Sequence, residues 1–483
     1  MGFPPADNHT GIFCLALALA CVVLFALFTS AGRRLPPGPR KGFFGTMKVP
    51  QTYQWLAYAK WMKIYGDIIY IRVLGNPVMV INSAKAAEEL LERRSRNYSS
   101  RMGWDWLFST MPYGPRWRDH RSLFHRHFRR SLTSTHHPTM LKETRTTLRN
   151  FLDKPEDFAH HLRRTAAAIV MKMSYGHEVA DEGDFFVTLA DEALQGLGKA
   201  GIFGTFFVDY LPILKYIPDF MPGAGFKRQA RIWRQATRAM IDKPFQMVLD
   251  RMANGTAVPC FAQKELEIWM QTSDRDPRYE ALIKNVAGIS YAAGADTSVS
   301  TLLSFILAMV IHPEVQRKAQ QHLDDVTKKE RLPSFADKYE LPFIDCIVWE
   351  CLRWNPVTPM GVAHYVSEDD EYSGYFIPKG TSVLPNVWAI LHDEMCYPEP
   401  MMCPGRWLAF DSIWIAIASI LSVYTIEKAI TESGEEIMPK VEYTSSMISR
   451  PKPFKCRIVP RSEKARILIA QTRHDDTVAK TLP

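Results

Sequence analysis

Apolar residues form one unbroken run near the start of the 483-residue chain and then recur at helical or strand spacing. The run, GIFCLALALACVVLFALFTS at 11–30, holds no charged side chain and is long enough for one helical crossing of a bilayer. Arg and Lys follow this run and none precedes it, so the N-terminus is predicted to face the lumen. We therefore expect a transmembrane anchor at 11–31 rather than a cleaved signal peptide, after a lumenal tail at 1–10 that contains the sequon Asn8.

The pattern beyond the anchor predicts many helices and a few strands. Consecutive prolines make 32–42 an extended linker. Residues 68–94 have the pattern of two strands joined by a Gly-Asn-Pro turn and followed by a helix. Helical periodicity dominates from about 115 to 350, and its longest stretch, 280–312, is ended by Pro313.

The last third of the chain alternates between the two patterns. Residues 371–393 return to strands, with turns at 373–374 and 378–380. A long helix is predicted after Cys403, and a terminal hairpin over 446–462. We find no internal repeat and no inter-domain linker, so the sequence predicts one mainly α body with small β-sheets at 43–483, tethered to a membrane.

Composition narrows the class of partner and ligand. The chain is 47% hydrophobic and contains 26 Phe and 12 Trp, which favours a large apolar core or a pocket for an apolar ligand. A net charge of +8 without a localised basic stripe fits an anionic membrane or an acidic protein better than nucleic acid. Eight Cys without a C-x-x-C or zinc-type spacing favour a reducing compartment.

The stretch AAGADTS at 292–298 interrupts the longest apolar helix. Small residues up to Gly294 would let a flat ligand lie against the backbone, and Asp296 and Thr297 add an acid and a hydroxyl. One interpretation is an oxygen-binding groove in which Thr297 orients dioxygen and Asp296 relays protons. The other is a helix kink at Gly294 with a back-bonded Thr and a solvated Asp.

Two further pairs of residues share a helix face. Glu350 and Arg353, in VWECLRWNP, form either a surface ion pair or, given the apolar residues around them, a buried and fully hydrogen-bonded clamp. Trp117 and Arg121, in RWRDHR, can hold a carboxylate such as a haem propionate, although a basic exposed helix has the same pattern. His364 is a further candidate propionate donor, or a structural histidine.

Cys403 lies in MMCPGRWLAF, directly before a long apolar helix. A thiolate gains from the free N–H groups and positive dipole at a helix N-terminus. As the fifth ligand of haem iron it would favour O–O cleavage. The alternative is a buried, inert cysteine.

The order of these motifs along the chain resembles the cytochrome P-450 family over essentially its whole length. The anchor, LPPGP, WRDHR, AGADTS, ECLR, HYVSEDDEYSGYFIPKGT, CPGR and PKPFKC succeed one another as they do in that family. The chain is most similar to the fungal membrane-bound branch, such as O-methylsterigmatocystin oxidoreductase-like enzymes. The resemblance implies a cytochrome P-450 fold, with 43–483 as the catalytic domain and haem b as the cofactor.

The resemblance also implies a role for each matching residue. Cys403 matches the axial ligand of the haem iron, and Gly294 belongs to the oxygen-binding groove. Asp296 and Thr297 match the acid–alcohol pair. The remaining matches hold the haem: the clamp behind it is Glu350 and Arg353, and the propionate donors are Trp117, Arg121 and His364.

Two elements of the family pattern are missing between residues 400 and 403. Tyr-Pro-Glu-Pro at 397–400 starts the family's meander, and Met-Met-Cys follows at once. The Arg-bearing remainder of the meander and the Gly-rich bulge around the thiolate are absent. An in-frame omission from the coding sequence would explain this gap, and a genuinely haem-poor protein is the alternative.

The implied activity is that of a haem-thiolate monooxygenase that inserts one atom of O₂ into a lipophilic terpenoid, steroid or polycyclic aromatic. Fungal secondary metabolism or xenobiotic oxidation is the expected setting. The chain has no nucleotide fingerprint, so electrons are expected from NADPH through a separate membrane-bound cytochrome P-450 reductase, with cytochrome b5 as a further candidate donor. Residues 201–226 match a membrane-facing lid, and the expected location is the endoplasmic reticulum membrane, single-pass, with the catalytic domain cytosolic. The rival hypotheses are a catalytically inactive membrane protein and a haem enzyme that rearranges oxygenated lipids.

Overall fold

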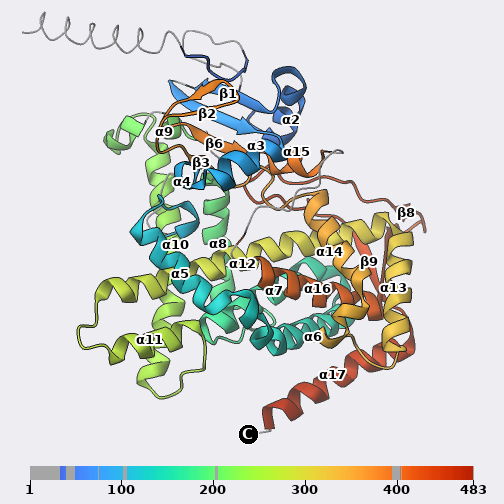
Figure 1. Cartoon of the computed structure of the whole chain (residues 1–483). Helices are drawn as coiled ribbons and strands as arrows, with labels where there is room; N and C mark the ends of the chain where they lie inside the picture. The colour runs from blue at the N-terminus through green and yellow to red at the C-terminus, as the bar shows by residue number, and fades with distance from the viewer. Residues whose placement is uncertain are drawn as a thin grey trace, which may run out of the picture.

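The computed structural model describes residues 33–39, 49–73, 75–101, 106–201, 205–210, 212–393, 403 and 405–481. The predicted tail and anchor, part of the linker and residues 394–402 lie outside this set. Figure 1 shows a helical body with a small sheet at one end. The mainly helical architecture with small sheets is therefore confirmed.

The N-terminal third of the described chain forms most of the larger sheet and the first helices. Its elements are α2 (Gln54–Tyr65), β1 (Ile68–Val73), β2 (Asn76–Ile81), α3 (Ala84–Ala87), the π-helix η1 (Glu88–Arg93), α4 (Ser95–Tyr98), η2 (Phe108–Thr110), α5 (Pro115–Phe128), η3 (Arg130–His136), α6 (His137–Asp153), η4 (Pro155–Asp157) and α7 (Phe158–Tyr175). The two strands predicted within 68–94 are confirmed.

The middle of the chain is helical. Its elements are α8 (Phe185–Ala200), α9 (Phe207–Tyr210), η5 (Pro212–Tyr216), α10 (Gly225–Ala253), α11 (Phe261–Gln271), α12 (Pro277–Ile311), α13 (Pro313–Thr327), η6 (Phe335–Glu340) and α14 (Pro342–Trp354). The longest helix, α12, starts where Asp276 caps the backbone N–H of Arg278 and ends just before Pro313, as the sequence predicts.

The C-terminal part returns to strands before two more helices. Its elements are β3 (His364–Tyr365), β4 (Asp370–Tyr372), β5 (Tyr375–Ile377), β6 (Ser382–Pro385), α15 (Val387–Leu391), α16 (Arg406–Val423), β7 (Tyr424–Ile430), β8 (Glu436–Ile437), β9 (Cys456–Pro460) and α17 (Glu463–Thr481). The larger sheet has the order β1-β2-β6-β3, with β2 parallel to β6 and the other pairs antiparallel.

The predicted terminal hairpin over 446–462 is wrong. Cys456–Pro460 is a strand, but it pairs with β7 in a sheet of order β8-β7-β9. Pro451 and Pro453 lack the N–H that a ladder requires, and the preceding stretch makes only an isolated bridge between Tyr443 and Pro451. The final helix α17 was not predicted, although Ala465, Ile469 and Thr472 form a buried stripe at helical spacing.

The helix α12 runs through the main hydrophobic core and packs against α5, α7, α10, α14 and α16. By length and apolar composition α12 and α16 could each cross a membrane, but both are largely enclosed by the body. Their hydropathy therefore reflects a core position. The run at 11–30 lies outside the described residues.

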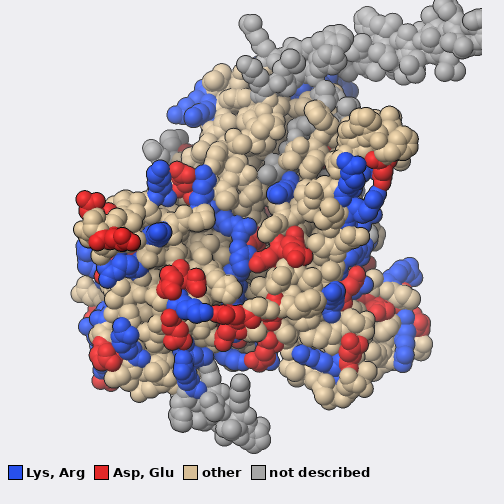
Figure 2. Space-filling model, turned by 180° about the vertical axis from the view of Figure 1, so that it is seen from behind, with Lys and Arg blue, Asp and Glu red and all other residues tan. Residues whose placement is uncertain are grey.

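The surface of the body carries both signs of charge. On the face seen in Figure 2, Lys and Arg lie among Asp and Glu, and the upper end of the molecule is mostly uncharged. Exposed apolar side chains concentrate around α9, η5 and the start of α10: Phe207, Ile213, Tyr216, Phe220 and Met221. Figure 1 places α9 at the same end as β1.

Candidate functional site

Cys403 lies two residues before Gly405, which is the N-cap of α16. Its side chain is exposed, yet the surrounding protein desolvates the thiol enough to raise its pKa. The N–H of Gly405 and the charges of Arg121 and Arg406 act in the opposite direction, toward the thiolate. The Cys403 thiol is therefore accessible to a ligand although nearby protein partly desolvates it.

The helix α5 brings Arg121 within electrostatic range of Cys403. Arg121 and Trp117 share one half-buried face of α5, and among the described residues no acceptor binds the Arg121 guanidinium. The adjacent His120 is buried. Its Nδ1–H donates to the Arg116 carbonyl (2.8 Å), so its Nε2 accepts from the Asn285 amide (3.2 Å). This bond ties α5 to α12, a role for His120 that the sequence alone did not reveal.

The middle of α12 is open to solvent on one side. Ala293 is exposed and Thr297 is half-buried, while the residues around them are mostly buried. An exposed alanine within a core helix indicates a hollow beside that turn. The Thr297 hydroxyl donates to the Ala293 carbonyl at 2.7 Å, as in the back-bonded interpretation of this motif.

Gly294 faces away from this hollow. A Cβ on Gly294 would lie 2.8 Å from Cγ2 of Val170 in α7, a distance too short for two carbon atoms. The missing side chain thus lets α7 approach α12. The packing role of Gly294 is established by this contact, and its assignment to an oxygen-binding groove remains a prediction.

Asp296 is buried and ion-paired, so the expected solvated Asp is wrong. Its Oδ1 lies 3.3 Å from Nη1 of Arg450 and 3.7 Å from Nη1 of Arg163. Arg163 also binds Asp191 of α8 at 2.7 Å. The carboxylate of Asp296 therefore joins α12 to α7, α8 and the turn that contains Arg450.

The Glu350–Arg353 pair forms, but it is not buried as the flanking apolar residues suggested. Both contacts between the guanidinium and the carboxylate are 2.7 Å, and Arg353 also donates to the Leu391 carbonyl at 3.3 Å. The side chain of Glu350 is 58% exposed, as is the neighbouring Trp349 in large part. Among the described residues, this face of α14 is therefore largely open to solvent.

His364 is buried beside Arg101, a second residue that the sequence alone did not reveal. His364 Nδ1–H donates to the Tyr98 carbonyl at 2.7 Å, and none of the described residues binds its Nε2. Burial and the charge of Arg101 lower the pKa of His364 to about 3. Burial lowers the pKa of Arg101 to about 10, and among the described residues Arg101 donates to the carbonyls of Val362 (2.5 Å) and Ala363 (3.4 Å).

Comparison with known proteins decides the family. The profile of the family described as Cytochrome P450 matches residues 36–453, which is most of the chain. The chain belongs to the cytochrome P450 family. Its activity is that of a cytochrome P450 monooxygenase.

The relatives are fungal cytochrome P450 monooxygenases. A protein of Armillaria gallica is 41% identical over 84% of this chain and 87% of its own length. Cytochrome P450 monooxygenase 98 of Postia placenta is 37% identical over 96% of this chain and 97% of its own length, and the ple1 enzyme of Rhodocybe pseudopiperita is also 37% identical. The Postia alignment has 507 positions, whereas 96% of 483 residues is about 464, so about 43 aligned positions have no residue in this chain.

The described residues of this P450 offer groups that suit the iron and the propionates of a haem, but the predicted Glu350–Arg353 clamp is not buried. An accessible thiol at a helix N-terminus can ligate an iron, and the cations Arg121, to which no described acceptor binds, and Arg101, which lies beside His364, suit two carboxylates. An anion between Arg101 and His364 would also offset the cost of burying them. Glu350, which the resemblance places in the clamp behind the haem, is instead exposed.

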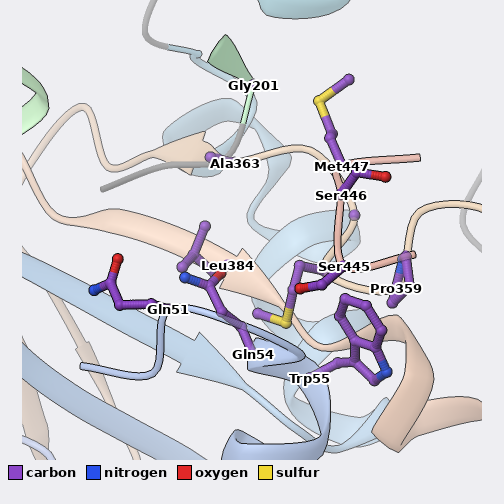
Figure 3. Close-up of a pocket in the computed structure, with 12 residues that line it drawn as sticks. Gln51, Gln54, Trp55, Gly201, Pro359, Ala363, Leu384, Ser445, Ser446 and Met447 are labelled. Carbon is purple, nitrogen blue, oxygen red and sulfur yellow. The ribbon is translucent and has the colours of Figure 1, made fainter. Parts of the chain in front are cut away.

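A separate hollow lies on the other side of the segment 359–363. Its volume is about 50 Å³, and it is partly open to solvent. Figure 3 shows it between the start of α2, the strand β6 with Leu384, and the turn with Ser445, Ser446 and Met447. Because the carbonyls of Val362 and Ala363 bind Arg101 on the opposite side, this segment separates the hollow from the Arg101–His364 pair.

Proposed function

We propose that this P450 holds haem b through Cys403 and oxidises a lipophilic substrate. The observation that carries the proposal is the accessible Cys403 thiol at the start of α16, within electrostatic range of Arg121 on α5. Both helices pack against α12, whose turn at Ala293 and Thr297 is open. When bound, a haem with a thiolate ligand supplies the electron density that favours O–O cleavage.

Some side chains of the site would then hold the haem, and others would donate or accept protons. Arg121, Trp117, Arg101 and His364 would hold the propionates. Because His364 Nδ1–H is already used by the Tyr98 carbonyl and the pKa of His364 is about 3 without a ligand, His364 would donate from Nε2 only after a propionate beside it had raised that pKa. The Thr297 hydroxyl faces the open turn of α12. Movement of Arg163 or Arg450 away from Asp296 would free its carboxylate to accept a proton.

The substrate class follows from the apolar surface. The exposed aromatic and aliphatic side chains around α9 and η5 are those of a surface that meets a bilayer. A lipophilic substrate such as a terpenoid, steroid or polycyclic aromatic would enter from that side. We place the enzyme in the endoplasmic reticulum membrane, single-pass with a cytosolic catalytic domain, in fungal secondary metabolism or xenobiotic oxidation.

Electrons would arrive at the opposite, proximal side. Arg130 and Arg406 flank the ring of Trp407 at 4.4 and 4.5 Å near the start of α16. A basic surface next to the thiolate suits the acidic surface of a flavoprotein. We infer that NADPH–cytochrome P-450 reductase is the donor, with cytochrome b5 as a second one.

A haem-poor, inactive protein is the second candidate, and two observations favour it. Glu350 is exposed where a clamp should be closed, and about 43 positions of the Postia alignment have no counterpart here. Loss of residues that support a metal ligand weakens metal binding roughly 10- to 100-fold. An omission between 400 and 403 in the coding sequence accounts for both observations.

The test is the carbon-monoxide difference spectrum of the reduced, membrane-expressed protein. Cys403→Ala should abolish a strongly red-shifted Soret band, whereas Cys346→Ala, which removes another exposed cysteine, should leave it intact. The absence of this band in the wild-type chain would overturn the proposal for the chain as written. A band that appears only in a longer transcript, resequenced across 400–403, would establish the omission.

A further inference from the structure

The linker residues 33–39 lie on the body as an extended segment, which we call the strap. Its prolines favour an extended backbone. The N–H of Tyr70 in β1, the edge strand of the larger sheet, donates to the Pro37 carbonyl at 2.8 Å. Pro36 is buried, and a Cβ on Gly38 would collide with the Tyr70 carbonyl oxygen, so the close approach needs glycine. The C-terminal half of the strap is therefore attached to β1.

The N-terminal half of the strap binds β5 in the hairpin β4–β5. The N–H of Phe376 donates to the Arg34 carbonyl at 2.7 Å. The Arg33 guanidinium lies 4.4 Å from the ring centroid of Phe376, and the Arg34 guanidinium lies 5.1 Å from that of Tyr375. Both distances are within the reach of a cation–π interaction. We call these contacts of Arg33 and Arg34 with Tyr375 and Phe376 the clasp.

The hairpin β4–β5 is itself fixed to the body. Arg94 Nη1 lies 3.1 Å from each carboxylate oxygen of Asp370, and the hydroxyl of the buried Tyr98 donates to the same carboxylate at 2.9 Å. Next to the hairpin, Asp369 Oδ2 lies 3.5 Å from Arg33 Nη1. A strap that is bound to both β1 and this hairpin cannot pivot on the body without breaking contacts at one of them.

The clasp is close in sequence to the proposed membrane anchor. Arg33 follows the apolar run at 11–30 by three positions, and an extended chain covers at most about 3.6 Å per residue. The clasp therefore lies within about 11 Å of the end of this run. One layer of lipid headgroups is roughly 5–7 Å thick, so a short connection of this length would hold the hairpin beside the membrane surface.

The strap, β1 and the exposed apolar residues of α9 and η5 belong to one end of the molecule. Figure 1 shows β1 and α9 at this end and α17 at the opposite end. A flexible linker would let the body turn any of its faces toward the bilayer. A strap that is fixed to the body would instead select the end that carries Phe207, Ile213 and Phe220.

We propose that the clasp locks the strap to the body and thereby holds the end with β1 and α9 against the bilayer. This inference rests on the proposed membrane anchor and adds the device that orients the body on it. Release of Arg33 and Arg34 from the hairpin would convert a rigid connection into a flexible one. The apolar surface of α9 and η5 would then leave the bilayer more often.

Trypsin cleavage after Arg34 reports the release of the strap, because a bound strap cannot enter the protease. The rate is measured on the full-length protein in detergent, by mass spectrometry of the fragment that starts at Leu35, under conditions in which cleavage follows the population of released strap. The Tyr375→Ala, Phe376→Ala double variant should be cleaved about 5- to 30-fold faster, the factor expected for two exposed cation–π contacts. Equal rates in the wild type and the double variant would overturn the proposal.

Two further variants separate the clasp from a general effect of removing aromatic side chains. Phe185→Ala is the matched control, because Phe185 is an exposed aromatic residue whose ring centroid lies 4.8 Å from Nζ of Lys243, away from the strap. It should leave cleavage after Arg34 unchanged. Arg33→Gln keeps the hairpin intact and should raise the rate about 2- to 5-fold, which tests the clasp if the hairpin variants unfold in urea at lower concentration.

Hydrogen exchange in nanodiscs tests the orientation. Backbone amides of residues 213–221 should exchange faster in the double variant than in the wild type, whereas those of α17, at the opposite end in Figure 1, should not change. Faster cleavage with unchanged exchange at 213–221 would overturn the orienting role. A chain that does not enter nanodiscs would overturn the membrane placement and the orienting role together, whereas equal cleavage rates in detergent would overturn the clasp alone.

Discussion

Two explanations for the glycine at position 294 predict opposite effects of Gly294→Ala on the stability of the protein. If the position only needs to be small on an open helix face, Gly294→Ala should stabilise α12 by about 1 kcal/mol, the helix-propensity difference between Gly and Ala. The structure instead puts the new Cβ 2.8 Å from Cγ2 of Val170, which is itself buried. Overpacking of this kind costs about 1–3 kcal/mol, so the net effect should be destabilisation by up to about 2 kcal/mol.

The contact can be tested by removing its other half. Val170→Ala deletes two methyl groups and should cost about 2–3 kcal/mol from lost burial and the resulting cavity. In the double variant the Gly294→Ala methyl occupies that cavity, so the two costs should not add. We expect a favourable coupling energy of about 1–3 kcal/mol.

The assay is urea denaturation of the two single variants and the double variant, with haem content measured on the same preparations. Gly198→Ala is the matched control, because this glycine is also in a helix and nothing lies within 4 Å of its added Cβ. That control should gain stability. Additive effects at Gly294 and Val170 would refute the packing argument, and a double variant that regains stability but not haem would support the oxygen-groove assignment.

Three further predictions concern charged and titratable groups. Without haem, the free energy of unfolding should fall as the pH drops from about 6.5 toward 3. Burial and Arg101 hold the pKa of His364 near 3, so the unfolded chain binds a proton that the folded chain does not, which costs at most about 1.4 kcal/mol per pH unit for this histidine. Urea midpoints at several pH values check this: His364→Asn should lose less stability than the wild type, and a flat profile contradicts the prediction. Arg101→Gln should lower the haem content of purified protein severalfold and Arg101→Lys less, measured as the pyridine haemochrome, and unchanged content would remove Arg101 from the site. Glu350→Gln should cost less than about 1 kcal/mol in urea denaturation because its carboxylate is solvated, and a loss of several kcal/mol would show that the carboxylate is covered in solution.

Elements with strong periodicity or strong terminators could be predicted from the sequence. The helix α12 and the β1–β2 pair were found because their signals are local: an apolar run ended by Pro313, and two strands around a turn. The pairing of β9 with β7 could not be predicted, since register across 30 residues depends on the core rather than on either segment. The apolar residues of α17 recur at helical spacing, but the many charged residues between them made this pattern hard to recognise.

The candidate site shows the same division. The types and order of Cys403, Arg121 and His364 predict one site; the structure brings Arg121 within electrostatic range of Cys403, and the place of His364 in that site stays a prediction. The hydrogen bond between His120 and Asn285, and the proximity of Arg101 to His364, join residues more than 160 positions apart and have no local signal. The exposure of Glu350 depends on which distant segments pack on α14, and the local motif around Glu350 cannot predict this.

The exposed face of α14 decides how the missing positions should affect this P450. The side chains of Glu350 and Arg353 are already paired at 2.7 Å, and Trp349 packs against Phe410 with ring centroids 4.8 Å apart although it is 48% exposed. If a segment is omitted between 400 and 403, the surface of α14 that would receive it is already formed without it, and we expect the protein to express as a stable body. The Cys403 thiol has the Gly405 N–H and two arginines, but its pKa is still raised by desolvation. An omitted segment that wrapped the thiolate in further N–H groups would lower that pKa and strengthen the iron bond, and for this reason haem affinity, rather than folding, is the property that the longer transcript should change.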